Sequence, residues 1–503
     1  MAQNLVTVVR VTVDDATAPF EPAPPAISSG VIAVVKRDCP TCELVVPVLR
    51  RIAASEIGLA VYVQDDPSFP DLGDDSPIDD TSLEFSFHHD IETVPTLIEV
   101  RDGVELRRTV GWSRSDWQDY GGDASLGADL PESRPGCGSM SVDPMLADEL
   151  MARFNGSILT GRRIDFAAME DEFEAAFDRG WTDGLPVIPP TEVRVLRMLG
   201  GTHRDPAEVV ATVPPNLVDV TVEQVAVNAV MAGCKPEYLP VLLAAVEAAC
   251  TDEFNMHGLL ATTYFSGPVI VVNGPITKRI GMNSEGNVFG QGNRANLTIG
   301  RALQLVVRNI GGGIPGQVDM AMHGSPGKLG FCFAEREHDS PFTSLAVSRG
   351  FDPQDSTVTL FAGQGPTPIV DQLSRTPESL ARSMAMILRS AHHPKLVIGM
   401  DAMLVVSPEH GRVFSDAGWD RARLESELAE LLIVPGTELI RGAAFVDEGF
   451  PREFADSALP KFRPGGMPVV HAGGDAGLFS SVLTGWVGGP KGSDIVTKKI
   501  VGV

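Results

Sequence analysis

The stretch "VVKRDCPTCELVVPVLRRI", residues 34–52, decides how the N-terminal part of the chain folds. The β-branched run "VIAVVKRD" (31–38) predicts a strand followed by a polar break, and apolar residues at helical spacing predict a helix within residues 43–58. Cys39 therefore lies just before a helix, and Cys42 lies in its first turn. Because free N–H groups and the helix dipole stabilise a thiolate there, Cys39 is the expected nucleophile and Cys42 the expected resolving thiol.

Composition limits the partners and the compartment. The chain has 503 residues, 40 Lys and Arg against 66 Asp and Glu, and a formal charge of −26. Such a charge repels phosphate backbones and anionic membranes, so neither a nucleic acid nor a membrane partner is predicted. The sequence also lacks a run of about 20 apolar residues and the features of a signal peptide. We therefore expect a cytoplasmic protein.

The cysteine pair has alternatives to a redox role. A close pair in a reducing compartment is typical of a catalytic or a metal-binding site rather than a structural disulfide. A zinc site needs two further ligands, and His88 and His89, followed by Asp90, are the candidates nearby. Two inert buried thiols are a third interpretation.

A second motif lies downstream of the pair. The segment "IETVPTLIEVRDGVELRRTVGW" (91–112) predicts a strand, an Asp-Gly turn and another strand. The cysteine pair, the Val-Pro-Thr triplet and the Asp-Gly hairpin together resemble the thioredoxin fold over about residues 4–120. The resemblance implies that Pro95 is cis and faces the dithiol, leaving backbone groups free to pair with a peptide or thiol substrate. Asp38 replaces the family's usual Trp, which leaves the redox potential and the partner open.

The whole chain is predicted to be α/β, with a thioredoxin-like domain followed by a larger, Gly/Pro-rich mixed α/β domain. We expect the first domain over residues 1–120, a linker and connecting helix over 121–160, and the larger domain over 161–503. A division into two subdomains is expected near residues 370–395. Cys137, in "PGCGS", is interpreted either as a surface thiol of the linker or as a relay thiol between domains.

Alternating helical and strand patterns predict the mixed character of the larger domain. The helices are "VTVEQVAVNAVMAGC" and "PEYLPVLLAAVEAAC", and the strands are "GPVIVVNGP", "STVTLFAG", "KLVIGM" and "AMLVVSP". Its long motifs, including "MNSEGNVFGQGNRANLTIGRAL", resemble a bacterial family labelled thioredoxin-like or UGSC-like. The resemblance implies no particular activity. The motif in that label, selenocysteine or cysteine before Gly-Ser-Cys, is approached only by "CGSM" at 137–140.

The segment "GSPGKLGFCFAEREHDSP" (324–341) concentrates reactive residue types in the larger domain. Strand alternation predicts that Cys332 shares a face with Lys328, a cation that lowers a thiol pKa. Lys328 with Glu335 then supplies the charge and the proton transfer that a cysteine nucleophile needs. The alternative interpretation is an ordinary core thiol, and Cys137 and Cys234 are the next candidates for a catalytic cysteine.

Asn/Gly turns supply candidate ligand-binding groups. Asn273, Asn283, Asn287 and Asn293 are predicted to line a substrate pocket, and Asn293 precedes a helix N-terminus suited to an anion. Pure turn formation is the alternative for each of them. A separate hypothesis joins histidines into a metal site, although no metal-binding spacing supports it. Its members are His257, His323 and His410.

The leading functional hypothesis is a thiol-dependent oxidoreductase of the thiol–disulfide type. In it, the CxxC domain serves a cysteine in a larger domain that binds a small-molecule or thiol substrate. A metal-assisted hydrolase or lyase, with the first domain as a docking module, is the alternative, and a binding protein without catalysis is the third. No cofactor is predicted, a metal remains open, and the oligomeric state cannot be read from the sequence.

Overall fold

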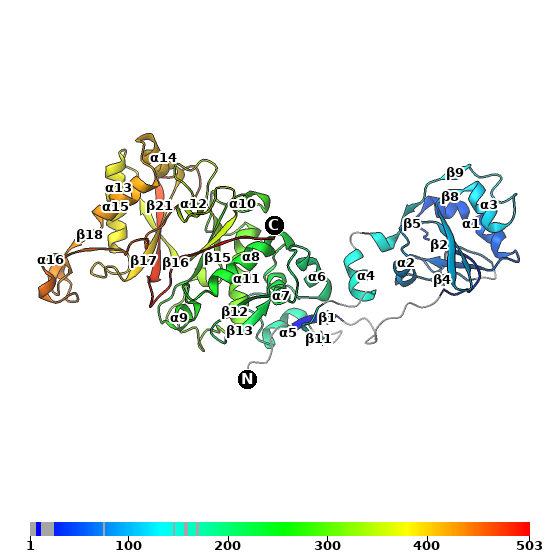
Figure 1. Ribbon diagram of the computed structural model, residues 1–503, viewed down its shortest axis with the longest axis horizontal. Coiled ribbons are helices and arrows are strands. Elements are labelled where there is room, and N and C mark those ends of the chain that lie inside the picture. The colour runs from blue at the N-terminus through cyan, green and yellow to red at the C-terminus, as the bar shows by residue number, and fades with distance from the viewer. Residues whose placement is uncertain are drawn as a thin grey trace. The chain divides into compact units, whose positions relative to one another are not determined.

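The computed structural model describes residues 7–11, 25–73, 76–143, 146–154, 159–166 and 171–502, and the protein has an α/β fold with mixed sheets (Figure 1). The chain divides into two compact units. The small unit is Val13–Ile158, and the large unit combines Met1–Thr12 with Leu159–Val503. Within the described ranges, no helix has the length and apolar character needed to cross a membrane.

A five-stranded sheet in the order β4-β3-β2-β6-β7 forms the centre of the small unit. Strands β2, β3 and β4 are parallel, β6 is antiparallel to β2, and β7 is antiparallel to β6. Asp102 and Gly103 turn the chain between β6 and β7 with positive φ angles, which confirms the predicted Asp-Gly hairpin. The bounds are β2 (Gly30–Val35), β3 (Leu59–Val63), β4 (Ile78–Asp79), β6 (Thr96–Arg101) and β7 (Val104–Val110).

Helix α1 (Pro40–Ala53) follows β2 and presents the dithiol, as the sequence predicts. Cys39 is its N-cap, with extended backbone angles, and Pro40 occupies the first helical position, where a missing N–H costs nothing. The buried face of α1 carries Val45, Leu49 and Ile52, which join the core of the unit. The other helices of this unit are α2 (Glu84–His88), α3 (Arg114–Gly121) and α4 (Ala147–Phe154).

Residues expected to form a linker are instead built into the small unit. Strand β9 (Ser133–Arg134) pairs with β8 (Trp112–Ser113), and β10 (Cys137–Gly138) pairs with β5 (Thr93–Val94). The 3₁₀ turn Met140–Val142 follows β10, and α4 packs Leu150 and Phe154 beside Leu83. The prediction that the first domain ends at residue 120 is wrong. The Gly and Pro residues of 121–143 allow close packing within the small unit and do not form a loose linker.

The N-terminal strand also differs from the expected domain layout. Strand β1 (Thr7–Val11) pairs in parallel with β11 (Arg162–Phe166) and belongs to the large unit. The small unit is therefore inserted between β1 and the remainder of the large unit in sequence. Short sequence patterns do not predict this pairing, because the two strands lie about 150 residues apart in the sequence.

The large unit is organised around a seven-stranded sheet in the order β15-β14-β16-β21-β17-β20, with β22 also paired to β16. The sheet strands are β14 (Gly267–Asn273), β15 (Phe331–Ala334), β16 (Thr357–Val370), β17 (Met400–Val406), β20 (Val469–His471), β21 (Phe479–Val487) and β22 (Val496–Lys499). Two further antiparallel pairs are β12 (Val209–Val213) with β13 (Val218–Thr221) and β18 (Ile433–Pro435) with β19 (Ala458–Pro460). The helices are α5 (Glu172–Asp178), α6 (Glu192–Leu199), α7 (Val222–Ala232), α8 (Leu239–Ala249), α9 (Met256–Ala261), α10 (Ile276–Arg279), α11 (Arg294–Asn309), α12 (Leu345–Ser348), α13 (Pro377–Ser390), α14 (Pro408–Asp416), α15 (Arg421–Leu431) and α16 (Gly436–Leu439).

The sheet of the large unit contains an internal structural repeat. In each half a helix leads into a strand, further helices follow, a second strand returns parallel to the first, and a long strand then pairs antiparallel with the first. The elements α8, β14, α11, β15 and β16 correspond in this way to α13, β17, α15, β20 and β21. Strands β16 and β21 pair antiparallel between the halves, with Gly363 opposite Gly485. The two halves are therefore related by an approximate two-fold rotation.

Strand alternation divides the large unit into three apolar layers. On β14, Val269 and Val271 face one layer, which also takes side chains from β17, β20 and β21. Ile270 and Val272 face the other way, into a core formed with α7, α8 and α11. The second half packs its outer face against α13, α14 and α15. Figure 1 shows the two helical groups beside opposite halves of the sheet.

The two edge strands of this sheet meet at their carboxyl ends. The backbone N–H of Arg336, after β15, donates to the carbonyl of His471 in β20 at 2.8 Å, and His471 Nδ1 lies 2.9 Å from the carbonyl of Arg336. The sheet is thus curled until its edges touch. The polar residues that follow β14, β15 and β20 gather at this junction.

Most predicted elements of the large unit are present, but "KLVIGM" (395–400) is not a strand. Ile398 has a positive φ and donates its N–H to the carbonyl of Lys461, which is incompatible with a regular ladder. Strand β17 begins only at Met400. The apolar residues of the segment serve packing rather than strand formation: Val397 is buried against Val434 of β18 and Leu459 of β19.

Candidate functional site

Three cysteines of the small unit form one cluster at the start of α1. The backbone N–H of Cys42 donates to Cys39 Sγ at 3.4 Å, and Cys39 Sγ lies 3.6 Å from the carbonyl oxygen of Val94. The third sulfur belongs to Cys137, which pairs with Val94 in the neighbouring strand and is one of the groups that lower the pKa of Cys39. The Val94–Pro95 peptide is cis, as the resemblance implies, and it lies directly beside the cluster.

The thiols of this cluster differ in their acidity. Burial opposes ionisation of Cys39, but hydrogen bonds from the side chains of Cys137 and Cys42 and from the N–H groups of Cys42 and Thr41 outweigh it, so its pKa is lowered. Burial raises the pKa of Cys42 strongly, and a negative Cys39 raises it further. Cys39 is therefore the most acidic thiol of the group, in agreement with its position at the N-terminus of α1.

Cys137 is held in place by backbone pairing. It lies opposite Val94 in the β5–β10 pair, and Gly138 lies opposite Thr93. Burial raises the pKa of Cys137, and its hydrogen bond to Cys39 raises it further. The sequence offered both a surface thiol and a relay thiol for this residue, and the structure brings it to the dithiol. The glycines that flank Cys137 in "PGCGS" are the sequence signal that could have indicated this close approach.

Buried polar side chains support the segment that follows Cys137. Gln64 Nε2 donates to Ser139 Oγ at 2.6 Å and to Ser86 Oγ at 2.7 Å, while the N–H of Met140 donates to Gln64 Oε1. Ser139 also donates its N–H to the carbonyl of Glu92. This network fixes the backbone just after β10. The "CGSM" sequence therefore has a structural role that composition alone does not reveal.

The zinc alternative finds no support around the pair. Throughout the described ranges, no group of three His, Cys, Asp or Glu side chains is arranged to hold a metal ion. His89 instead stacks on Phe85, and burial lowers its pKa. The same finding removes the geometric basis for a metal joining His257, His323 and His410. His410 is buried, with Nδ1 2.7 Å from Ser480 Oγ.

Cys332 does not form the predicted nucleophilic site. It is only 5% exposed on β15 and packs into the core shared with α7, α8 and α11, where burial raises its pKa. Lys328 is turned to Asp319, with Nζ 2.7 Å from Oδ1, and is not among the groups that affect the Cys332 thiol. The prediction failed because Lys328 lies in a separate 3₁₀ turn rather than on the strand.

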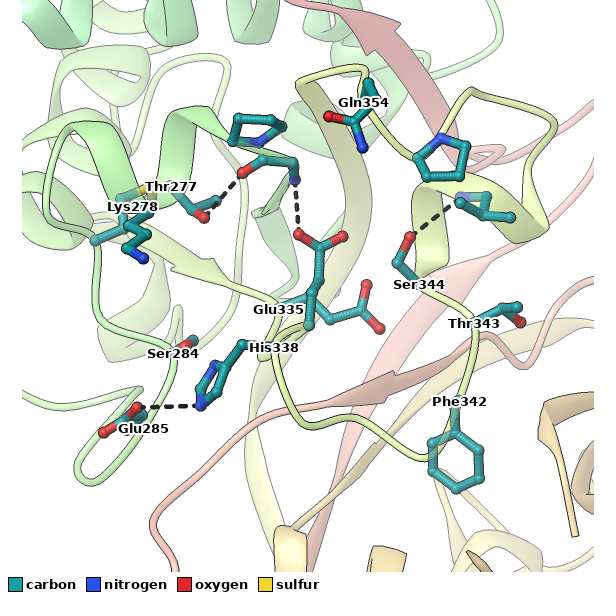
Figure 2. A pocket seen from close by; sticks show the side chains of 16 residues that line it. Thr277, Lys278, Ser284, Glu285, Glu335, His338, Phe342, Thr343, Ser344 and Gln354 are labelled. Carbon is teal, nitrogen blue, oxygen red and sulfur yellow. Dashed lines mark hydrogen bonds and ion pairs between the residues drawn. The ribbon is translucent and has the colours of Figure 1, made fainter. Parts of the chain in front are cut away.

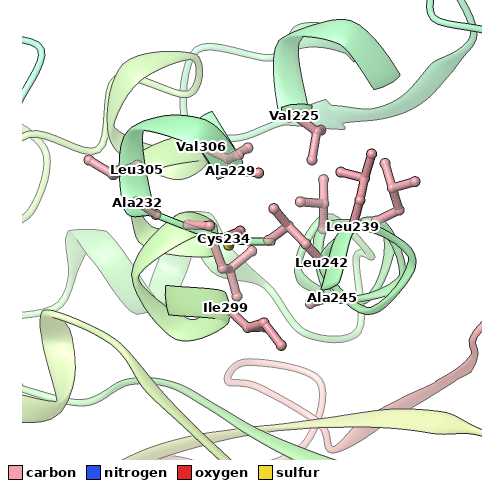
Figure 3. Packing of buried hydrophobic residues seen from close by; sticks show 14 of the residues in the cluster. Val225, Ala229, Ala232, Cys234, Leu239, Leu242, Ala245, Ile299, Leu305 and Val306 are labelled. Atoms are coloured by element: carbon pink, nitrogen blue, oxygen red, sulfur yellow. The ribbon is translucent and has the colours of Figure 1, made fainter. Parts of the chain in front are cut away.

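The other cysteines of the large unit are also protected. Burial raises the pKa of Cys234 and of Cys250 to about 12 each. Figure 3 shows Cys234 enclosed by aliphatic side chains such as Leu242 and Ile299. Cys250 is only partly buried, at the end of α8, but no hydrogen bond donor lowers its pKa. The large unit therefore offers no activated thiol among its described residues.

Glu335 lies instead at the edge-strand junction, in a polar cluster. Its carboxylate accepts from Asn273 Nδ2 at 2.6 Å, from the N–H of Leu345 at 2.7 Å, and from Arg421 at 3.2 Å. Asn273 also donates to Glu337 Oε1 at 2.9 Å, so one amide group joins two carboxylates. Burial raises the pKa of Glu335, against the opposing effects of Arg421 and Asn273. Glu335 anchors three elements to one another.

A pocket of about 800 Å³ opens beside this cluster, lined by Glu335 and Glu337 together with residues after β14 and before α12. In Figure 2, His338 is turned toward Glu285, with its Nε2 3.7 Å from the carboxylate. Ser344 instead caps α12 through the N–H of Val347. Carboxylate oxygens outnumber the lining cations here. The pocket is therefore suited to a small polar ligand that brings hydrogen-bond donors.

The predicted asparagines divide between this cluster and simple turns. Asn273 is part of it, as described above. Asn283 and Asn287 bond to carbonyls of their own loops, and Asn293 caps α11 by accepting from the N–H of Asn296. All three line a shallow pocket of about 400 Å³, but their side chains are committed to the backbone. Turn formation and helix capping, the alternative interpretation, account for these hydrogen bonds, and ligand binding by the three amides stays a prediction.

No family model, curated protein or solved structure matches this chain. The functional argument therefore rests on the geometry of the two units.

Proposed function

We propose that the protein is a thiol-dependent oxidoreductase whose small unit is a thioredoxin-type thiol–disulfide centre. Cys39 is the nucleophile and Cys42 resolves the mixed disulfide. The observation that carries the proposal is the Cys42 N–H donating to Cys39 Sγ at the N-terminus of α1. This contact, together with the lowered pKa of Cys39, supports a thiolate beside a second thiol that can close a disulfide.

The sheet order and the neighbourhood of Pro95 support the same assignment. A strand-to-helix turn presents the cysteine pair, and the cis Val94–Pro95 peptide lies beside it, with the Val94 carbonyl oxygen 3.6 Å from Cys39 Sγ. Neither Cys234 nor Cys332 of the large unit is supported as the thiol acceptor, because both are buried with raised pKa values. The proposal therefore assigns the dithiol a partner other than Cys332.

The proposal gives the large unit a ligand-binding role. Its support is the acceptor-rich pocket beside Glu335, into which Glu337 contributes a second carboxylate. Joining a binding unit and a dithiol in one chain raises the effective concentration of each for the other's ligand. The reacting compound is then a small polar molecule, or a small thiol, delivered to the chain that also carries the redox centre.

A redox titration tests the dithiol assignment. The reduced chain is equilibrated with mixtures of reduced and oxidised dithiothreitol, quenched with acid, alkylated and analysed by mass. We expect one two-electron transition that forms a Cys39–Cys42 disulfide, absent in Cys39→Ser and retained in Cys332→Ser. Failure to form this disulfide at any ratio of the two reagents would show that the centre is not a redox dithiol.

A further inference from the structure

The dithiol is closed to solvent, although a third thiol beside it is not. Cys39 and Cys42 are each 0% exposed, whereas Cys137 is only partly buried. A buried sulfur cannot exchange with an external thiol unless another sulfur carries the exchange or the cover opens. Cys137 pairs with Val94, whose carbonyl oxygen lies 3.6 Å from Cys39 Sγ, so among the described residues it is the partly exposed cysteine placed beside the nucleophile.

The cover is made by residues 134–139, called here the docked segment. It is tied to β8 through Arg134, to β5 through Cys137 and Gly138, and to the carbonyl of Glu92 through the N–H of Ser139. Two side chains next to the dithiol hold it as well. Thr41 Oγ1 donates to the carbonyl of Pro135 at 2.7 Å, and Lys36 Nζ donates to that of Gly138 at 2.8 Å.

Glycine allows this segment to approach so closely. A Cβ on Gly136 would lie 2.6 Å from the carbonyl oxygen of Val94, and one on Gly111 would lie 2.8 Å from the backbone N of Gly136. Because both contacts are to backbone, the segment would have to move away to accept either side chain. A Cβ on Gly138, two residues along, would meet no atom within 4 Å. The edge of β5 is thus filled by the chain itself and is closed to a strand from a partner.

We propose that Cys137 is a third redox residue, which relays disulfide exchange between the covered Cys39/Cys42 pair and a small external thiol. This inference rests on the proposed dithiol function. In the oxidised form, the Cys137 thiolate attacks Cys39 Sγ, the Cys39–Cys42 bond breaks, and Cys42 leaves with the electron pair and takes up the proton lost by Cys137. The products are a Cys39–Cys137 disulfide and a Cys42 thiol.

An external thiol then completes the cycle. Its thiolate attacks the exposed Cys137 Sγ, releases Cys39 as the stabilised thiolate, and leaves a mixed disulfide on Cys137. A second molecule of the thiol attacks the mixed disulfide, releasing the small disulfide and the Cys137 thiol. Two external thiols are oxidised, one protein disulfide is reduced, and no other reactant is needed. Cys39 suits this step because a low thiol pKa makes a good leaving group.

Disulfide mapping tests the bond itself. The full chain, as wild type, Cys42→Ser and Cys137→Ser, is oxidised with oxidised glutathione, quenched with acid, alkylated and mapped by mass spectrometry after digestion. We expect Cys42→Ser to form a Cys39–Cys137 disulfide and Cys137→Ser to form only Cys39–Cys42. If Cys42→Ser yields glutathione on Cys39 with Cys137 free, the relay is overturned. If Cys137→Ser also fails to form Cys39–Cys42, the proposed function fails instead.

Exchange kinetics test whether the relay is used. The oxidised chain is mixed with reduced glutathione, and we expect Cys137→Ser to slow its reduction by about tenfold or more, because the remaining sulfurs are covered. Adding Gly136→Ala to Cys137→Ser should displace the docked segment and restore the rate, whereas Gly138→Ala should not. A wild-type rate in folded Cys137→Ser, or equal rates in the two glycine variants, would overturn the relay.

Discussion

Cys39 and Cys332 are both buried, the first after an apolar strand and the second within one, yet their pKa values are shifted in opposite directions. Cys39 accepts hydrogen bonds from N–H groups at the start of a helix and from Cys137, and its pKa is lowered. Cys332 lies on β15 among apolar side chains, and burial raises its pKa. Burial alone therefore disfavours a thiolate, and fixed donors aimed at the sulfur reverse the effect.

Charged residues lie close to both cysteines in the sequence, and in neither case do they determine the thiol pKa. The segment around Cys332 is rich in charge, with Lys328 and Glu335 close by, but both side chains serve other partners. Lys36, Arg37 and Asp38 directly precede Cys39, yet the main causes that lower its pKa are hydrogen bonds rather than these charges. A charged residue close in sequence to a cysteine therefore need not shift its pKa, because the two side chains can lie on different faces of a strand or in different elements.

The largest loss of stability is expected when Glu335, a charged residue close to Cys332 in the sequence, is replaced. Its carboxylate pairs with Arg421, and both side chains are almost completely buried. Replacing Glu335 with Ala leaves a buried guanidinium without this partner, which should cost about 3–5 kcal/mol of unfolding free energy. Urea denaturation followed by fluorescence of the large unit measures it.

Glu425→Ala is the matched control, because Glu425 is 3.7 Å from the same arginine but is substantially exposed. Its loss should cost about 1 kcal/mol or less, since exposed ion pairs contribute little. Equal losses in Glu335→Ala and Glu425→Ala would mean that Glu335 is not the structural anchor, and its place beside the pocket would then return it to a chemical role.

The next effect concerns Cys332. A hydroxyl at this position has only apolar neighbours in its core, so Cys332→Ser should lose about 1–3 kcal/mol of stability while the glutathione exchange rate of the small unit stays unchanged. Cys250→Ser, at the partly buried end of α8, should change stability by about 0.5 kcal/mol or less. If folded Cys332→Ser lost glutathione exchange, Cys332 would be a nucleophile after all, as first predicted from the sequence.

Local signals in the sequence predicted the elements that local physics determines. The strand and helix around the cysteine pair and the Asp102–Gly103 hairpin are present where expected, because strand and helix periods and turn residues act over a few positions. Cys39 as an N-cap follows from the same local rules. The α/β character of both units is also visible in the alternation of helical and strand patterns.

The features that were not predicted from the sequence depend on pairing between strands far apart in the chain. The β1–β11 pair, the β5–β10 pair and the internal repeat of the large unit join segments that no short pattern connects. The meeting of Cys137 with Cys39 depends on one of these pairs. Glu335 and Asn273 likewise come together because β14 and β15 are parallel neighbours, which separates a true cluster from the asparagines that only form turns.

A smaller effect tests one of those asparagines. Asn293 caps α11 by accepting from the N–H of Asn296, so Asn293→Ala should cost about 1 kcal/mol, the usual value for a lost N-cap. Asn293→Ser should recover most of it, because a serine hydroxyl accepts the same bond. Thermal unfolding of the two variants gives the comparison. A stable Asn293→Ala protein would point away from capping and toward the ligand-binding role first predicted.

The smallest and most specific effect is the pH dependence that Cys39 contributes to stability. Its pKa is lowered in the folded chain from an ordinary value of 9.0, so between the folded pKa and 9.0 the unfolded chain binds more protons than the folded one. The contribution is therefore fully present above pH 9, and it is lost as pH falls through the folded pKa. The unfolding free energy of reduced wild type minus that of Cys39→Ser should rise with pH across this window.

The corresponding difference for Cys332→Ser should be flat below pH 9, because the raised pKa of Cys332 keeps that thiol protonated in both states. A flat difference for Cys39 as well would show that donors at the start of α1 do not outweigh burial, and the contrast between the two cysteines would then disappear.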